Sequence, residues 1–318
     1  MTMGKLFDKL LNRKKERHPR CAALVPAAGR SERMGGTDKL TAPLCGVPVL
    51  LRTLRALDEA ALIDEIVVAV SPERLEEIAA LCAGANVKTP LRVVEGGGSR
   101  TQSVLLAALA AGDDVIYIGM SGGISGTAQA AVIAAGELTE KYPARKIVTI
   151  DTYAASLGEG LQVLEAARMI EEGKSLDEIK THLLSRRPHM CQFFTVDDLA
   201  YLKRGGRISS ATVLIGTVLS IKPILRGDET GHIVSCGKVR GMKRAYQELA
   251  NYYDARALDK SEMLGIAHAD NEEGAQALIA LLRDKGFTGE CLNVVYEPVT
   301  GAHVGPGTVA LFFYGKEK

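Results

Sequence analysis

Short apolar runs alternate with stretches of helical periodicity along the first half of the chain. Continuously apolar strands that alternate with helices are typical of a parallel sheet covered by helices on both faces. In such a sheet, ligands bind beyond the carboxyl ends of the strands. The pattern predicts strands at residues 22–25, 66–70, 92–94, 115–118 and 147–150, and helices at about 49–57, 73–82, 99–111 and 128–140.

The second half of the chain begins with two long helical stretches, predicted at residues 154–172 and 175–185. Ser175 and Glu178 have the spacing of a capping box, which predicts where the second of these helices begins. Residues 197–224 indicate a short helix, a basic glycine turn and an apolar helix that ends at Lys222-Pro223. A second α/β domain is expected from about Pro188, with strands at 189–196, 233–239, 263–267, 292–295 and 309–313.

Composition narrows the possible partners. The 318 residues carry 39 basic and 38 acidic side chains, so no net field favours nucleic acid. Tryptophan is absent and aromatic residues make up only 5% of the chain, which also weakens a role in base stacking. We therefore expect no nucleic-acid partner.

The six cysteines form no Cys-x-x-Cys pair and no cluster with histidine at metal-ligand spacing. We expect reduced thiols and no metal site. No apolar run is long enough to span a membrane, and the N-terminus has too short an apolar core for a signal peptide, so a cytoplasmic protein is expected. Residues 1–20 form a basic tail that either is solvated or lies on an anionic membrane surface; the solvated tail is favoured, since its four large apolar residues bury little area.

A glycine-rich turn, PAAGRSERMGGTDK, spans residues 26–39 between a predicted strand and a predicted helix. Its backbone N–H groups could wrap a phosphate, with Arg33 and Lys39 supplying positive charge. The spacing matches neither G-x-G-x-x-G nor a Walker loop, and a purely structural turn is an equal alternative.

Residues 20–111 as a whole resemble the first half of methylerythritol-phosphate cytidylyltransferases. The resemblance lies in this turn and in APLCGVPVLLRTLRAL, IDEIVVAVSPE and VVEGGGSRTQSV. It implies CTP and magnesium as cofactors, with Arg33 and Lys39 as the catalytic cations. The residues that it places around the nucleotide are Ala27, Ala28, Gly29, Gly97, Arg100 and Ser103.

The chain departs from that family after the fourth strand. The family has an aspartate there that helps to hold magnesium, whereas this strand runs into Gly119-Met120-Ser121. Two phosphates brought together without a bound cation repel each other, so we expect little or no transferase activity and no catalytic residue.

From Val115 to the end, the chain resembles the DegV family of fatty-acid-binding proteins. The matching segments are IGMSGGISGT, VTIDTYAASLGEGLQVLEAARMIEEGKSLDEI, VDDLAYLKRGGRIS, IKPIL, GKVRGMKRA and GAHVGPGTVALFF. The resemblance implies a non-catalytic carrier of a long-chain fatty acid that needs no cofactor. Its expected lipid-binding residues are Ser121, Gly122, Ser125, His303 and Gly305.

The same resemblance suggests that Lys203, Arg204 and Arg207 form a surface for a partner kinase; a solvated basic turn is the equal alternative. Ser121 and Ser125, on a turn that opens a helix, are expected to offer hydroxyl and backbone donors to a carboxylate. A lone histidine in a glycine turn is usually structural, but the matching motif favours His303 as a head-group ligand. The family usually has two adjacent serines where this chain has Ser121-Gly122, and a threonine-bearing N-terminal segment of the family is missing, which predicts a weakened site.

The expected fold is α/β, with a parallel Rossmann-like sheet domain followed by a second α/β domain. The expected divisions are a tail at 1–20, a composite domain at 21–187 and a DegV-like domain at 188–318. Within the composite domain, 21–112 resembles the cytidylyltransferases and 113–187 the DegV proteins. Fatty-acid binding is the favoured function, an inactive or weak CTP-dependent cytidylyltransferase is the alternative, and a protein that binds neither ligand well is the third possibility.

Overall fold

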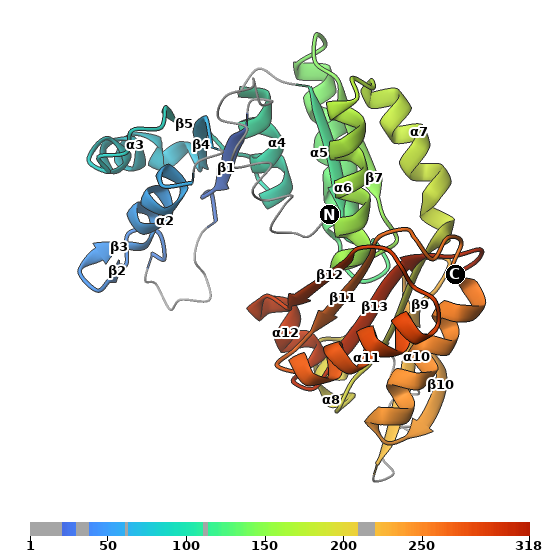
Figure 1. Ribbon diagram of the computed structural model, residues 1–318. Coiled ribbons are helices and arrows are strands. Elements are labelled where there is room, and N and C mark those ends of the chain that lie inside the picture. Colours follow the sequence, from blue (N-terminus) through green and yellow to red (C-terminus); the bar gives the residue numbers. More distant parts are fainter. Residues whose placement is uncertain (1–20, 30–37, 61–62, 111–113, 209–219) are drawn as a thin grey trace. The chain divides into compact units, whose positions relative to one another are not determined.

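The computed structural model describes residues 21–29, 38–60, 63–110, 114–208 and 220–318 (Figure 1). The chain forms two compact units. The first unit comprises Met1–Tyr117 and Gln129–Thr149, and the second comprises Ile118–Ala128 and Ile150–Lys318. The predicted domain boundary near Pro188 falls inside the second unit. The two compact units therefore differ from the predicted domains at 21–187 and 188–318, and those domains stay a prediction.

A parallel three-stranded sheet lies at the centre of the first unit, in the order β1 (Ala22–Pro26), β4 (Glu65–Val70) and β5 (Leu91–Glu95). All six residues of β4 are buried, as expected for a central strand covered on both faces. Ile66, Val68 and Val70 pack with Leu54 and Ile78 in one cluster. The alternate residues Val67 and Ala69 pack against Ala107.

Among the described residues up to 110, four helical segments and a short hairpin accompany this sheet. Leu54 belongs to α2 (Val49–Asp58) and Ile78 to α3 (Leu75–Ala83), so both helices cover the same face of the sheet. Ala107 lies on α4 (Arg100–Ala110), which covers the other face. The remaining elements are the two-residue strands β2 (Pro43–Leu44) and β3 (Val47–Pro48) and the 3-10 turn η3 (Pro72–Arg74).

Three elements carry the chain between the units: β6 (Val115–Gly119), α5 (Thr127–Lys141) and β7 (Ile147–Asp151). Among the described strands, β6 pairs with β7 and not with β1, so the predicted run of parallel strands is divided into two sheets. Within the first unit, Leu105 and Leu109 of α4 pack against Ala134 and Leu138 of α5.

The second unit is built on a six-stranded mixed sheet in the order β10-β9-β8-β13-β11-β12. Its β11–β12 pair is parallel and its other pairs are antiparallel. The strands are β8 (Met190–Thr195), β9 (Ile221–Gly227), β10 (Ile233–Arg240), β11 (Leu264–His268), β12 (Cys291–Val295) and β13 (Val309–Tyr314).

Helices lie on both faces of this sheet. On one face, α10 (Met242–Arg256) and α11 (Glu272–Asp284) bury Leu249 and Leu278 against Phe193, Ile266 and Leu311. On the other face, Leu161 of α6 (Leu157–Glu171) packs with Ala310 and Phe312. The other helical segments are α7 (Leu176–Arg186), η4 (Arg187–His189), α8 (Ala200–Arg204) and α12 (Pro298–Val304).

The start of α7 confirms the predicted capping box. The Ser175 hydroxyl accepts the Glu178 N–H, and the Glu178 carboxylate accepts the Ser175 N–H at 2.8 Å. Among the described residues, no helix is long and apolar enough to cross a membrane.

Two predicted elements are corrected by the structure. Lys222-Pro223 does not end a helix but lies in β9, where Pro223 is paired with Lys238 of β10. Proline inside a helix would remove a hydrogen bond, whereas an extended strand accommodates its fixed φ. The rest of the predicted apolar helix, residues 213–219, lies outside the described residues. The second correction concerns His303, which belongs to α12 and not to a glycine turn.

Candidate functional site

The serine turn begins immediately after β6, in the second unit. Ser121 is only 1% exposed, and its hydroxyl donates to the Gly231 carbonyl at 2.8 Å. Gly231 lies in the tight connection between β9 and β10, at φ +81°, and a Cβ added to it would lie 1.9 Å from Ser121 Oγ. The absence of a side chain at Gly231 therefore allows the hairpin to contact the turn directly.

In the serine turn, the five backbone N–H groups from Ser121 to Ser125 donate within the protein. Ser121 N–H donates to the Ala154 carbonyl at 2.8 Å, and the four that follow also have acceptors. These are the Asp151 carboxylate for Gly122, Ser121 Oγ for Gly123, and the Ser121 carbonyl for Ile124 and Ser125. A ligand anion can gain an N–H here only by replacing one of these acceptors.

Ser125 lies at the end of the turn, where α5 begins. Its hydroxyl is 2.6 Å from that of Thr127 and accepts the Thr127 N–H at 3.3 Å. Ser125 therefore accepts the first backbone N–H of α5, which has no partner inside the helix. The Ser125 hydroxyl therefore has a structural partner in addition to its predicted role toward a lipid carboxylate.

His303 lies in the last turn of α12 and faces the end of α8. A Cβ added to Gly205 would lie 2.5 Å from His303 Nδ1. Gly305 follows α12 at φ +81°, and a Cβ there would lie 2.5 Å from the ring of Tyr201. Both glycines are therefore needed for the close packing of α8 on α12.

The basic turn predicted as a partner surface lies in the same place. Lys203, Arg204 and Arg207 are exposed. The Arg204 guanidinium stacks 4.5 Å from the Tyr201 ring, and Arg207 donates to the Gly205 carbonyl. His303, Gly305 and the basic turn therefore form one cluster, whereas Ser121, Gly122 and Ser125 contact a different set of residues around β7 and the β9–β10 connection.

The residues predicted to bind a nucleotide gather at the carboxyl end of the first unit's sheet. A Cβ added to Gly96 would lie 2.9 Å from both Ala28 Cβ and Ser103 Oγ. Ser103 Oγ accepts the Gly97 N–H at 3.1 Å. A Cβ added to Gly29 would lie 3.6 Å from Lys39 Nζ.

The other residues that were predicted at the nucleotide are Ala27, Arg33 and Arg100. Ala27 is buried, and its N–H donates to the Ala69 carbonyl at 2.7 Å. Arg33 lies outside the described residues. Arg100 begins α4, and its side chain also lies outside what the structure describes.

Asp38, next to Lys39, is held as a carboxylate. Its partial burial would raise its pKa, but hydrogen bonds from Arg74, Thr41 and Leu40 together lower that pKa well below its ordinary value. The Arg74 guanidinium lies 2.8 Å from Asp38 Oδ2. Asp38 is therefore joined to η3 and is already neutralised by Arg74.

Magnesium, which the cytidylyltransferase resemblance implies, does not fit the side chains that are described. Among these residues, no group of three or more His, Cys, Asp or Glu side chains could hold a metal ion. Asp151 does lie at the carboxyl end of a strand, but its carboxylate is bonded to backbone N–H groups of the second unit.

Sequence reasoning did not single out Asp151, Gly231 or Glu159. Burial raises the pKa of Glu159, in the first turn of α6, to about 7. Asp151 and Gly231 contact residues that are distant in the sequence: Asp151 bonds to Gly122, 29 positions away, and Gly231 bonds to Ser121, 110 positions away. An acid directly after an apolar strand was the one available signal for Asp151.

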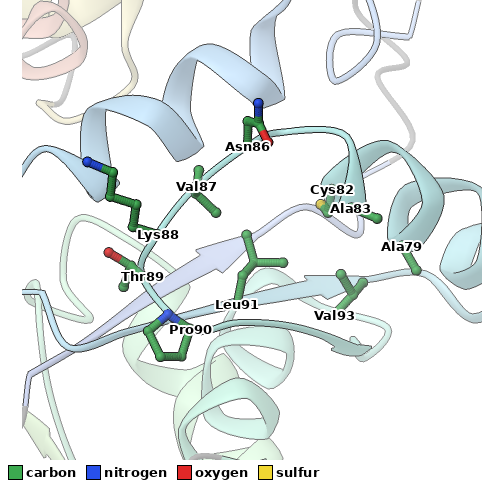
Figure 2. Close-up of a pocket in the computed structure, with 10 residues that line it drawn as sticks. All are labelled: Ala79, Cys82, Ala83, Asn86, Val87, Lys88, Thr89, Pro90, Leu91 and Val93. Atoms are coloured by element: carbon green, nitrogen blue, oxygen red, sulfur yellow. The ribbon is translucent and has the colours of Figure 1, made fainter.

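A pocket of about 560 Å³ lies elsewhere on the first unit, where α3, the loop after it and β5 meet (Figure 2). Leu91 and Val93 of β5 form part of its lining, with Cys82 from α3 and Val87 from the loop. Its lining contains none of the predicted nucleotide or lipid residues, so the pocket is separate from both predicted sites.

Comparison with known families shows to which family the chain belongs. The model described as "Uncharacterised protein, DegV family" matches residues 99–316, which is more than half of the chain. The chain belongs to the DegV family. The model for 2-C-methyl-D-erythritol 4-phosphate cytidylyltransferase matches residues 21–141, a smaller part. Both predicted resemblances are confirmed, and the two matches overlap over residues 99–141.

Curated members of the DegV family match the same part of the chain. A DegV domain-containing protein of Clostridium perfringens is 40% identical over 208 residues, which are 65% of this chain and 72% of that protein. A second DegV domain-containing protein, from Lactococcus lactis, is 36% identical over 207 residues, which are 64% of this chain and 70% of that protein.

Solved DegV structures match more of the chain than the sequence relatives do. A fatty-acid-binding DegV family protein from Thermus thermophilus is 26% identical, with a TM-score of 0.63 over 92% of this chain and 99% of that one. A fatty-acid-binding DegV family protein from Streptococcus agalactiae, 24% identical, has a TM-score of 0.63 over 94% and 100%. The predicted α/β fold with two sheet domains is confirmed. Because these matches cover more than nine-tenths of the chain, they also include most of the front half that resembles the cytidylyltransferases.

Proposed function

We propose that this DegV family chain is a non-catalytic, cytoplasmic carrier of a long-chain fatty acid, which presents the acyl carboxylate to a partner kinase. The observation that carries this proposal is the packing of His303 against the exposed basic turn of Lys203, Arg204 and Arg207. A head-group ligand next to a cationic surface suits a protein that shows a bound carboxylate to an enzyme. The fatty-acid-binding DegV protein of Thermus thermophilus supports the choice of ligand.

Energetics favour an acyl chain as the source of affinity. Burial is worth about 0.8 kcal/mol per methylene, so a long chain gains on the order of 10 kcal/mol in an apolar tunnel. Hydrogen bonds to a charged carboxylate add about 1.5–3 kcal/mol each and set its orientation. The proposed head-group residues are His303 beside the basic turn and, as a separate group of donors, Ser121, Gly122 and Ser125 at the serine turn, with Gly305 allowing α12 to pack.

Native mass spectrometry tests the proposal without a guess about the ligand. Protein purified from lipid-replete cells should carry a mass increment that corresponds to one fatty acid. His303→Ala should weaken oleate binding about tenfold, the equivalent of about 1.4 kcal/mol, because one charged-group hydrogen bond is lost. His182→Ala, on α7, serves as the matched control and should bind as the wild type does. A mass without any bound ligand would contradict fatty-acid binding. Unchanged oleate binding by His303→Ala would contradict the head-group role of His303.

The kinase surface has its own test. A variant with Lys203, Arg204 and Arg207 all replaced by Ala should bind oleate normally but should be a poor substrate for a fatty acid kinase. The Streptococcus pneumoniae Fatty Acid Kinase B3 protein loaded with linoleic acid, 17% identical, shares the fold and suggests this assay. Equal acyl-phosphate formation by the variant and the wild type would contradict the kinase surface and favour the alternative, a solvated basic turn.

A further inference from the structure

Asp151 joins the turns that follow β6 and β7. Its two carboxylate oxygens lie 3.2 and 3.1 Å from Gly122 N, and Oδ1 also accepts the Tyr153 N–H at 3.0 Å. The serine turn predicted to receive an anion therefore already holds a carboxylate, which belongs to the chain itself.

Glycine at position 122 makes room for this carboxylate. A Cβ added to Gly122 would lie 2.6 Å from Asp151 Oδ2. The φ of Gly122 is not in the left-handed region, so the backbone alone does not require glycine there. Any larger residue would displace Asp151 from its present position.

The Gly122 N–H belongs to an exposed residue of the turn. Gly122 is exposed, whereas Ser121 is buried and its N–H donates to the Ala154 carbonyl at 2.8 Å. The bonds from Gly122 to Asp151 are longer, at 3.2 and 3.1 Å, and they join the turn to a half-buried side chain. An anion that binds the Gly122 N–H must therefore replace Asp151.

We propose that Asp151 is a resident competitor for the head-group donor and thereby sets how tightly a carboxylate binds at the serine turn. The inference rests on the proposed fatty-acid function and deepens it. The acyl carboxylate and the Asp151 carboxylate are the same chemical group, and both suit the Gly122 N–H. Two carboxylates at one donor also repel each other, so the ligand binds only as Asp151 withdraws.

The test compares oleate with oleyl alcohol, which has the same chain but no charge. Asp151→Asn keeps the side-chain shape while removing the charge and the stronger acceptor. We expect it to lower the Kd for oleate about tenfold and to leave the Kd for oleyl alcohol unchanged. Gly122→Ala, which displaces Asp151 by sterics alone, should shift oleate affinity in the same direction.

Asp259→Asn is the matched control. Asp259 is in the same unit, and its carboxylate likewise accepts the N–H two residues further on, that of Ser261 at 2.7 Å. Its removal takes away one negative charge from the unit without touching the serine turn, and it should leave both affinities unchanged. Tighter oleate binding by Asp259→Asn equal to that of Asp151→Asn would assign the effect to net charge and overturn the inference.

The outcomes separate this inference from the proposed function. If wild-type protein binds neither oleate nor oleyl alcohol, the fatty-acid function fails and the inference fails with it. If the wild type binds oleate but Asp151→Asn binds it equally or more weakly, the function stands and the competitor role is overturned. Thermal unfolding of each variant, measured alongside, establishes that the compared proteins are folded.

Discussion

The two glycine-rich turns of this protein look alike in sequence but hold opposite charges. In the first unit, Lys39 reaches the glycine turn after β1, and its neighbour Asp38 is already paired with Arg74. In the second unit, the serine turn after β6 binds the carboxylate of Asp151, and its N–H groups from Gly123 to Ser125 donate to Ser121. A glycine-and-serine turn after a strand therefore says little about its ligand until the residues that contact it are known.

The contact between Gly231 and Ser121 offers the largest expected effect. Gly231→Ala places a Cβ 1.9 Å from Ser121 Oγ, at a φ of +81° that side chains rarely adopt. Strain and overpacking together should lower the free energy of unfolding by about 3 kcal/mol, measured by denaturant titration. Gly126→Ala is the control, since nothing lies within 4 Å of a Cβ at that position. Equal stability of the two variants would mean that the hairpin does not depend on this approach.

Asp38 of the first unit and Glu159 of the second should respond to pH in opposite ways. Asp38 is stabilised as an anion, whereas burial raises the pKa of Glu159 to about 7. Between its ordinary pKa of 4.5 and about 7, Glu159 keeps its proton only in the folded state, so stability falls as pH rises through this range. Glu159→Gln has no carboxyl group to ionise and so avoids this loss of stability. Between pH 5 and pH 8, its free energy of unfolding should therefore rise relative to that of the wild type by about 2 kcal/mol, after a discount for the partial exposure of the side chain.

Denaturant titrations of both proteins at pH 5 and pH 8 measure this difference. Glu178→Gln provides a comparison, because hydrogen bonds within the capping box lower the pKa of Glu178 instead of raising it. A difference between wild type and Glu159→Gln that stays constant from pH 5 to pH 8 would contradict an uncharged Glu159 in the folded protein.

The smallest expected effect concerns Lys39. Because the strand that ends at Gly119 is not followed by the aspartate that helps to hold magnesium in the cytidylyltransferases, we expect Lys39 to support no transferase chemistry. Pyrophosphate release from CTP, magnesium and methylerythritol phosphate should stay at background in both the wild type and Lys39→Ala. Release by the wild type that Lys39→Ala abolishes would revive the cytidylyltransferase alternative and reverse the contrast between the two turns.

Local pattern predicted much of the fold. The apolar run at 66–70 became the buried strand β4, and the capping box at Ser175 opened α7. The pattern failed where local preference and tertiary context disagree. Pro223 suggested the end of a helix, yet β9 pairs through it, because neighbouring strands supply partners that a proline-containing helix could not. His303, surrounded by glycines, suggested a turn, but Glu297 caps a short helix there through the Val299 and Thr300 N–H groups.

The sequence by itself determined that this is an α/β chain with two family resemblances, because apolar periodicity and contiguous motifs are written along the chain. It also identified the serine turn and His303 as candidate lipid-binding residues, although it placed His303 in a glycine turn and not in a helix. Only the tertiary structure decided which of them meet: His303 packs beside the basic turn, while Ser121 bonds to Gly231 and Gly122 to Asp151. Hydrogen-bond donors are satisfied by whatever folding brings within about 3 Å, and partners tens of residues away leave no local pattern.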